Sequence, residues 1–129
     1  MSEKTRLAVF VSGSGTNLQA IIDAEISTVD IVLVVSNNPE AFALERIKKY
    51  HIPSLVIDHR KYSGREEFER RLLESIRPYK IDLIVLAGFM RILSPFFVRE
   101  YKSRIMNIHP AILPSFPGVG ALKRHLSME

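Results

Sequence analysis

Short apolar runs alternate along the chain with amphipathic segments, in which apolar residues recur every three or four positions. Runs of this length that are rich in Val, Ile and Leu are typical of strands buried on both faces of a parallel sheet. The pattern predicts four strands, over residues 7–11, 31–35, 55–57 and 81–87, and a fifth candidate over residues 104–108 that could also be a loop.

The amphipathic segments begin at residues that commonly cap helices. Asn17 is predicted to cap a helix that carries Leu18, Ile21 and Ile22 on one face. Asn38 followed by Pro39 predicts a helix over residues 40–50, because proline is favoured at the first helical position.

A third helix is predicted after Ser63, which forms the pattern of a capping box with Glu66. Pro78 prevents this helix from continuing. Its apolar face is expected to bury Phe68, Leu72, Leu73 and Ile76.

Ser94 and Pro95 repeat the combination of cap and proline before a fourth helix over residues 96–101. Strand and helix thus alternate at least four times. Right-handed crossovers then give an α/β fold, a doubly wound, mostly parallel sheet with helices on both faces. Residues 110–120 are rich in proline and glycine and predict a shaped loop, which is followed by a short helical candidate over residues 121–128.

Length and composition narrow the class of protein. A chain of 129 residues is long enough for one domain and too short for two of ordinary size. No stretch approaches the roughly 20 apolar residues of a membrane span, and the N-terminus lacks the apolar run of a secretory signal. Because the chain has no cysteine, disulfides, Cys-ligated zinc and thiol chemistry are excluded. A cytoplasmic location with no membrane partner is expected.

The charge is mildly basic, with 18 Lys and Arg against 14 Asp and Glu and a formal net charge of +4. Basic residues are interspersed with acidic ones rather than gathered into one tract, so no nucleic-acid partner is expected. The excess fits solvated helix surfaces. The alternative is a small anionic ligand such as a phosphate.

The first segment that could carry chemistry is Ser12-Gly13-Ser14-Gly15-Thr16-Asn17, between the first strand and the first helix. Two glycines allow a tight turn, and the free N–H groups at a helix N-terminus attract phosphate. The segment is not the GxGxxG dinucleotide fingerprint, because Leu18 stands at the third glycine position, and no Gly-Lys-Ser/Thr of a P-loop follows. An ordinary tight connection is the alternative.

Asn107 and His109, in the run Asn-Ile-His-Pro, lie at the end of the fifth strand candidate. Ligand sites in open α/β sheets lie outside the carboxyl ends of the strands. Two residues apart in an extended backbone, the two side chains point to the same side. One can donate a hydrogen bond to a developing oxyanion, and the other can move protons near neutral pH. A structural role is the alternative.

Phe89, Met90, Ile92 and Leu93 leave the fourth strand and are too apolar for an exposed loop, so they are expected to pack against other residues. They could belong to the core, or they could form the wall of a pocket for a flat aromatic ligand.

The remaining histidines, His51, His59 and His125, are interpreted as surface or local structural residues. No motif with metal-ligand spacing is present, so no metal is expected.

Three segments in this order and spacing, SGSGTNLQAII, LAGFMRILSPFFV and NIHPAILPSFPG, resemble the phosphoribosylglycinamide formyltransferases of purine synthesis. The resemblance covers residues 7–118 and implies a Rossmann-like sheet. It also implies two small-molecule substrates, glycinamide ribonucleotide and, as co-substrate, 10-formyltetrahydrofolate. Neither a covalent intermediate nor a metal is implied.

The resemblance assigns roles to individual residues. Gly15, Thr16 and Asn17 match the segment that holds the ribonucleotide phosphate. Arg65 matches a folate-contacting arginine. The catalytic asparagine and histidine correspond to Asn107 and His109, and Asn107 also borders the folate. The lining of the folate pocket corresponds to Met90, Arg91, Ile92 and Leu93.

The family continues beyond this resemblance with a part that carries a catalytic aspartate, and none of Asp23, Asp30, Asp58 or Asp82 takes its place. Residues 1–129 are therefore expected to be a single N-terminal formyltransferase domain, C-terminally truncated, with weak or no turnover alone. The alternatives are a formyltetrahydrofolate deformylase-like hydrolase and a non-catalytic module that binds phosphate or folate. The sequence leaves open whether the chain forms a homodimer.

Overall fold

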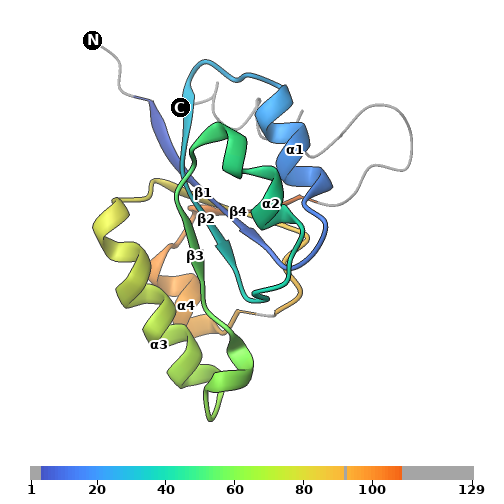
Figure 1. Cartoon of the computed structure of the whole chain (residues 1–129). Helices are drawn as coiled ribbons and strands as arrows, with labels where there is room; N and C mark the ends of the chain where they lie inside the picture. The colour runs from blue at the N-terminus through green and yellow to red at the C-terminus, as the bar shows by residue number, and fades with distance from the viewer. Residues whose placement is uncertain (1–3, 92, 109–129) are drawn as a thin grey trace.

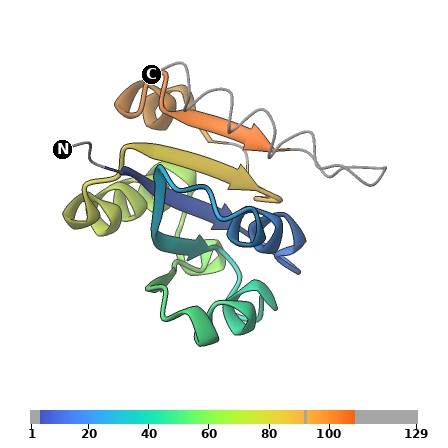
Figure 2. The ribbon, with the colours of Figure 1, turned by 90° about the horizontal axis from the view of Figure 1, so that it is seen from above.

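The predicted apolar runs form one sheet in which all five strands are parallel. In this computed structural model, which describes residues 4–91 and 93–108, the order across the sheet is β3-β2-β1-β4-β5. The arrows visible in Figure 2 accordingly point in one direction. The strands are β1 (Thr5–Val11), β2 (Val29–Ser36), β3 (Ser54–Val56), β4 (Leu83–Ala87) and β5 (Ile105–Ile108).

Strand β1 is the centre of the sheet. Its Val9 pairs with Val34 on one side and Val85 on the other, and all three are completely buried. Burial on both faces explains why these strands read as continuous apolar runs rather than as an alternating pattern. The fifth strand candidate is confirmed, whereas β4 begins at Leu83, later than predicted.

Helices cover both faces, as predicted for a doubly wound sheet. They are α1 (Thr16–Asp23), α2 (Ala43–Arg46), α3 (Arg65–Ile76) and α4 (Pro95–Glu100), with short 3-10 turns at Lys48–Tyr50, His59–Lys61 and Arg77–Tyr79. In Figure 1, α1 and α2 lie on one side of the sheet, and α3 and α4 lie on the other.

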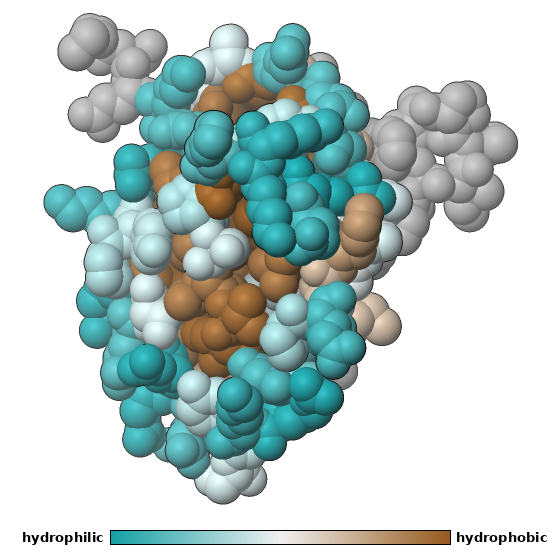
Figure 3. Space-filling view, viewed as in Figure 1, coloured by the Kyte–Doolittle hydropathy of each residue, from teal (hydrophilic) through white to brown (hydrophobic). Residues whose placement is uncertain are grey.

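Each face of the sheet has its own apolar core. Leu18 and Ile47 belong to the core beneath α1 and α2, whereas Phe68, Leu72 and Phe97 belong to the core beneath α3 and α4. Between α2 and α3, where the edge strand β3 lies, Figure 3 shows apolar surface surrounded by polar and charged residues.

The predicted cap of α1 is wrong by two residues. Gly15 occupies the cap position with φ of 80°, and it offers no side chain to accept a hydrogen bond. Asn17 lies inside the helix and is only 6% exposed. A glycine that adopts positive φ without strain turns the chain into the helix earlier than the asparagine could.

The predicted helix over residues 40–50 is also wrong in extent. Asn38 supports a turn instead, because its Oδ1 accepts a hydrogen bond from the Glu40 N–H at 3.0 Å. Helix α2 begins only after Phe42, and the following 3-10 turn ends at His51 with φ of 57°. Asn and Asp side chains commonly stabilise such turns in competition with a helix.

The expected capping box of α3 does not form. Gly64 is the cap residue, and the Ser63 hydroxyl donates to Glu67 Oε2 at 2.5 Å rather than serving a box with Glu66. The cap of α4 is confirmed, because Ser94 Oγ accepts from the Phe97 N–H at 3.5 Å.

Among the residues that the structure describes, no helix combines the length and apolar character needed to cross a membrane.

Candidate functional site

The carboxyl ends of parallel strands meet at one edge of a sheet, and the segments that leave them therefore gather there. After β1 comes the glycine-containing turn of residues 12–17, and after β4 comes the loop of residues 88–94, which is called the β4–α4 loop below. Strand β5 brings Asn107 to the same edge, opposite Leu86 of β4 in the sheet register. The sheet thus brings the predicted phosphate turn, the predicted folate wall and Asn107 to one side of the molecule.

The turn after β1 is packed tightly against α2. A Cβ atom added to Gly15 would lie 2.6 Å from the Cβ of Ala43, so only glycine fits there. The Ala43 N–H donates to the Gly13 carbonyl at 3.0 Å, and Arg46 Nε donates to the Ser14 carbonyl at 2.6 Å. Arg46 therefore places a positive charge beside the turn. The sequence did not indicate this contact, because Arg46 lies 32 residues after Ser14 in the chain.

Within this turn, Thr16 is exposed and Asn17 is buried. The first amides of α1 have no earlier carbonyl within the helix to accept from them, as at any helix N-terminus. The geometry suits an anion approaching Thr16 and the backbone. Because Asn17 is buried, its side chain is less accessible to such an anion than the sequence suggested.

The β4–α4 loop begins at Gly88 with φ of 76°. Phe89 packs its ring against Phe10 with 5.4 Å between centroids, and Leu93 joins the core beneath α3 and α4. The expectation that Met90 would also pack is wrong, since 79% of its surface is exposed. An exposed apolar side chain between two anchored ones is available to contact a ligand. Ile92 lies outside the described residues.

Two arginines stand near this loop. The Arg91 guanidinium lies over the ring of Phe68, with its central carbon 6.0 Å from the ring centroid. Arg65, the exposed first residue of α3, borders a cavity of about 400 Å³ between α3 and the start of α4. The structure therefore places Arg65 on the same side of the sheet as the loop.

The end of the loop is held by a carboxylate that the sequence did not single out. Glu69 of α3 is only 1% exposed, and its oxygens accept hydrogen bonds from the N–H of Ser94, at 2.7 Å, and from the Ser94 hydroxyl. The sequence predicts a surface position for a charged residue in the middle of an amphipathic helix. Only the packing shows that Glu69 is buried and holds Ser94.

The middle of the loop is held by a second polar group. The Met90 N–H donates to Ser12 Oγ at 2.8 Å, and the Ser12 hydroxyl donates to Asn37 Oδ1 at 2.5 Å. Asn37 Nδ2 lies 3.2 Å from His59 Nδ1, which agrees with the prediction of a local structural role for this histidine. These four residues border a further cavity of about 290 Å³.

Asp58 and Arg60 form an ion pair beside that cavity. Arg60 donates from Nε and Nη2 to the two carboxylate oxygens, each at 2.9 Å. These hydrogen bonds lower the pKa of Asp58 to about 2. The pair restrains the turn after β3, and it leaves Arg60 less free to attract another anion.

Asn107 is exposed on β5. Its expected partner His109 lies outside the described residues, as do the shaped loop and the helical candidate after it. Within the described chain, no three His, Asp or Glu side chains gather as metal ligands would.

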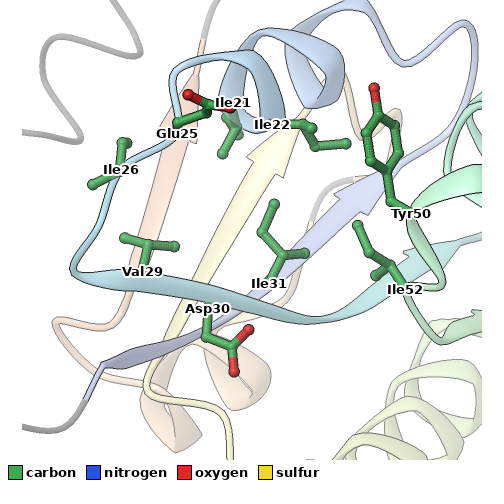
Figure 4. Close-up of a pocket in the computed structure, with 9 residues that line it drawn as sticks. All are labelled: Ile21, Ile22, Glu25, Ile26, Val29, Asp30, Ile31, Tyr50 and Ile52. Atoms are coloured by element: carbon green, nitrogen blue, oxygen red, sulfur yellow. The ribbon is translucent and has the colours of Figure 1, made fainter.

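A separate cavity of about 220 Å³ lies near the amino end of β2 and is lined mainly by isoleucines. Figure 4 shows Ile21 and Ile22 of α1 facing Ile31 and Ile52 across it. It lies away from the carboxyl edge of the sheet, where the turn, the β4–α4 loop and Asn107 meet.

The chain matches the family model described as formyl transferase over residues 5–128. It is similar to the trifunctional purine biosynthetic protein adenosine-3 of Drosophila melanogaster, at 45% identity over 95% of this chain and 10% of that protein. It is also similar to phosphoribosylglycinamide formyltransferase of Escherichia coli (strain K12), at 44% identity over 88% of this chain and 55% of that enzyme. The chain thus spans little more than half of the length of this bacterial relative.

Solved structures agree with this likeness. The phosphoribosylglycinamide formyltransferase of Coxiella burnetii matches with a TM-score of 0.80 at 41% identity, over 98% of this chain and 61% of that one. The glycinamide ribonucleotide transformylase 1 of Geobacillus kaustophilus matches with a TM-score of 0.79 at 36% identity, over 95% and 69% of the two chains.

Proposed function

Because the chain belongs to the formyl transferase family, we propose that it serves the transfer of a formyl group from 10-formyltetrahydrofolate to the amine of glycinamide ribonucleotide. The observation that carries the proposal is the 2.8 Å hydrogen bond between Met90 N and Ser12 Oγ. It joins the β4–α4 loop to the residue that begins the glycine turn. The segments assigned to folate and to phosphate are thereby neighbours, as a reaction between their two ligands requires.

The proposed phosphate site consists of Gly15, Thr16 and Asn17, with Arg46 adding positive charge. Gly15 keeps the backbone close to α2, so that the first amides of α1 can face the anion. Thr16 adds an exposed hydroxyl. A phosphate held there would fix the ribonucleotide by the end farthest from its reacting amine.

The proposed folate site lies along the β4–α4 loop, with Arg65, Met90, Arg91, Ile92 and Leu93 as its residues. Exposed Met90 offers apolar contact to a flat ring. The Met90 N–H is already bonded to Ser12, so backbone recognition of the pterin would have to use other groups of the loop.

In the proposed reaction the glycinamide amine attacks the formyl carbon, and a bond forms between that nitrogen and the carbon. Asn107 would donate a hydrogen bond to the formyl oxygen as negative charge develops on it. The bond from the carbon to the folate nitrogen then breaks. The proton lost by the amine passes to that nitrogen with the help of His109.

Turnover and binding by this chain test the proposal. In keeping with the weak turnover expected from the sequence, formylated ribonucleotide and tetrahydrofolate should appear together slowly, and Asn107→Leu should lower this rate by about 100-fold or more, the cost of removing one oxyanion donor. Gln19→Leu is the matched control, because it removes an amide that bonds to Asp23 and Tyr50 instead. Its rate should stay close to that of the unmodified chain.

An assay for released formate and calorimetry with each ligand separate the alternatives. Formate released without the ribonucleotide would favour the deformylase-like hydrolase, and binding of both ligands without reaction would favour a non-catalytic module. Binding of neither ligand would contradict the proposal. We place this activity in the cytoplasm, with small molecules as its partners.

A further inference from the structure

The β4–α4 loop combines an exposed side chain with a fixed backbone. Met90 is 79% exposed, yet its N–H is bonded at 2.8 Å to a serine 78 residues earlier in the chain. That serine, Ser12, is only 8% exposed. The backbone of the loop is therefore anchored to the residue that follows β1, in addition to its chain connection to β4.

The Ser12 hydroxyl has a single proton, and its direction is determined. It donates to Asn37 Oδ1, so a lone pair is left for the Met90 N–H. Asn37 is 3% exposed, and its Nδ2 is turned toward His59 Nδ1. Because one end of the amide is engaged by the histidine, the other end stays aimed at Ser12.

Ser12 is also the first residue of the turn assigned to phosphate. Its carbonyl accepts from Asn38 Nδ2 at 3.3 Å, which holds its backbone in place as well. One buried residue is thus bonded to both segments of the proposed site. A shift of the turn must move Ser12, and a shift of Ser12 must move the Met90 backbone.

We propose that Ser12, oriented by Asn37, is a positioning residue that couples the phosphate turn to the β4–α4 loop. This inference rests on the proposed function, since it takes the two segments as the sites of two ligands. Coupling between sites is reciprocal, so the ribonucleotide should tighten folate binding by the same factor as folate tightens ribonucleotide binding.

Calorimetry on the full chain tests the coupling, with tetrahydrofolate and glycinamide ribonucleotide titrated separately and then each in the presence of the other. Ser12→Ala removes the acceptor of the Met90 N–H. It should weaken tetrahydrofolate binding by about tenfold, the equivalent of one lost hydrogen bond. It should also abolish the mutual effect of the two ligands.

Ser36→Ala is the matched control. Ser36 is completely buried at the end of β2, and its hydroxyl also donates and accepts, toward the Asn38 carbonyl at 2.7 Å and from the Asn38 N–H at 3.0 Å. The Ser36 hydroxyl bonds to the Asn38 backbone, and its removal leaves the hydroxyl bonds of Ser12 to Asn37 and Met90 intact, so the two ligands should still affect each other in this variant.

A second pair of variants approaches the same hydroxyl from Asn37. Asn37→Ala keeps the Ser12 oxygen but removes the acceptor that orients its proton, so the hydroxyl can turn that proton toward the Met90 N–H. It should therefore weaken the coupling in the same direction as Ser12→Ala, which matters if that variant fails to fold. Asn37→Asp keeps an oxygen that accepts from Ser12 and should restore the coupling. Hydrogen exchange at the Met90 amide should be fastest in Ser12→Ala, intermediate in Asn37→Ala and slow in Asn37→Asp.

The outcomes distinguish the two proposals. If the unmodified chain binds neither ligand, the proposed function fails and the coupling fails with it. If it binds both, but Ser12→Ala and Asn37→Ala bind them with the same affinities and the same mutual effect, the positioning role of Ser12 is overturned while the proposed function stands.

Discussion

At the scale of single residues, the glycines of the site differ in what they do. Gly13 has open space around its α-carbon, and Gly88 has open space but a φ of 76°. Gly15 combines a φ of 80° with the close approach of Ala43. Gly15 and Gly88 therefore need the backbone freedom of glycine. Gly15 also needs the absence of a side chain, because a Cβ atom would overlap Ala43.

We expect Gly15→Ala to reduce the free energy of unfolding by about 3 kcal/mol, because it adds a steric overlap to the strain of a positive φ. Gly88→Ala should cost about 1 kcal/mol, through strain alone. Gly13→Ala should change little. Urea unfolding of the three variants measures the order. Equal losses for Gly15→Ala and Gly88→Ala would show that α2 moves away without cost.

At the scale of elements, α3 and α4 are joined by a polar contact inside an otherwise apolar layer. Glu69 accepts from Ser94, and Ser94 in turn caps α4 by accepting from the Phe97 N–H. Phe97 is completely buried beneath α4. The carboxylate thus sets where α4 begins and where the β4–α4 loop ends.

We expect Glu69→Ala to lower the free energy of unfolding by about 2–3 kcal/mol, because the Ser94 N–H and hydroxyl lose their acceptor in a buried place. Glu66→Ala is the control from the same helix. It breaks only the exposed pair with Arg70 and should cost less than about 0.5 kcal/mol. Denaturant unfolding compares the two. A loss no larger for Glu69→Ala than for Glu66→Ala would contradict the anchoring role.

At the scale of the whole described molecule, stability should decrease from the centre of the sheet to its edge. Strand β1 is paired on both sides and is buried throughout residues 7–11, whereas β3 has three residues and pairs only with β2 in the described sheet. Local opening requires fewer contacts to be broken at β3.

Hydrogen exchange should therefore be slowest in β1 and β4 and fastest in β3. The amide of Val9 is expected to exchange at the rate of global unfolding, and that of Ile57, which donates to the Ser36 carbonyl at the end of β3, much faster. Exchange followed by NMR at neutral pH measures both amides. Equal rates would show that the sheet opens only as a whole.

The predicted helix starts fared unevenly, and the reason lies in competition between local groups. Ser94 acts as a cap as its pattern suggested. Asn17, Asn38 and Ser63 also carry polar side chains that could cap a helix, but they do not, because a glycine takes the cap position or the side chain bonds within a local turn. Sequence patterns identify polar groups that could cap a helix, but not which alternative is lower in free energy.

The candidate site shows the same division. Its chemical residues, such as Thr16 and Asn107, could be named from their motifs, and the structure places the described ones at one edge of the sheet. The contacts made by Ser12, Asn37 and Glu69 could not be foreseen, because their partners lie 25 or 78 residues away.

The sequence by itself determined the order of strands and helices along the chain, the parallel sheet with both faces covered, and the three segments that resemble the family's motifs. These follow from periodicity and motifs, which are local along the chain. Only the tertiary structure decided that Met90 is exposed, that Glu69 is buried, and that Ser12 bonds to the loop after β4. Burial and hydrogen bonding between distant segments depend on which strands become neighbours, and the crossover of the chain from β3 to β4 sets this.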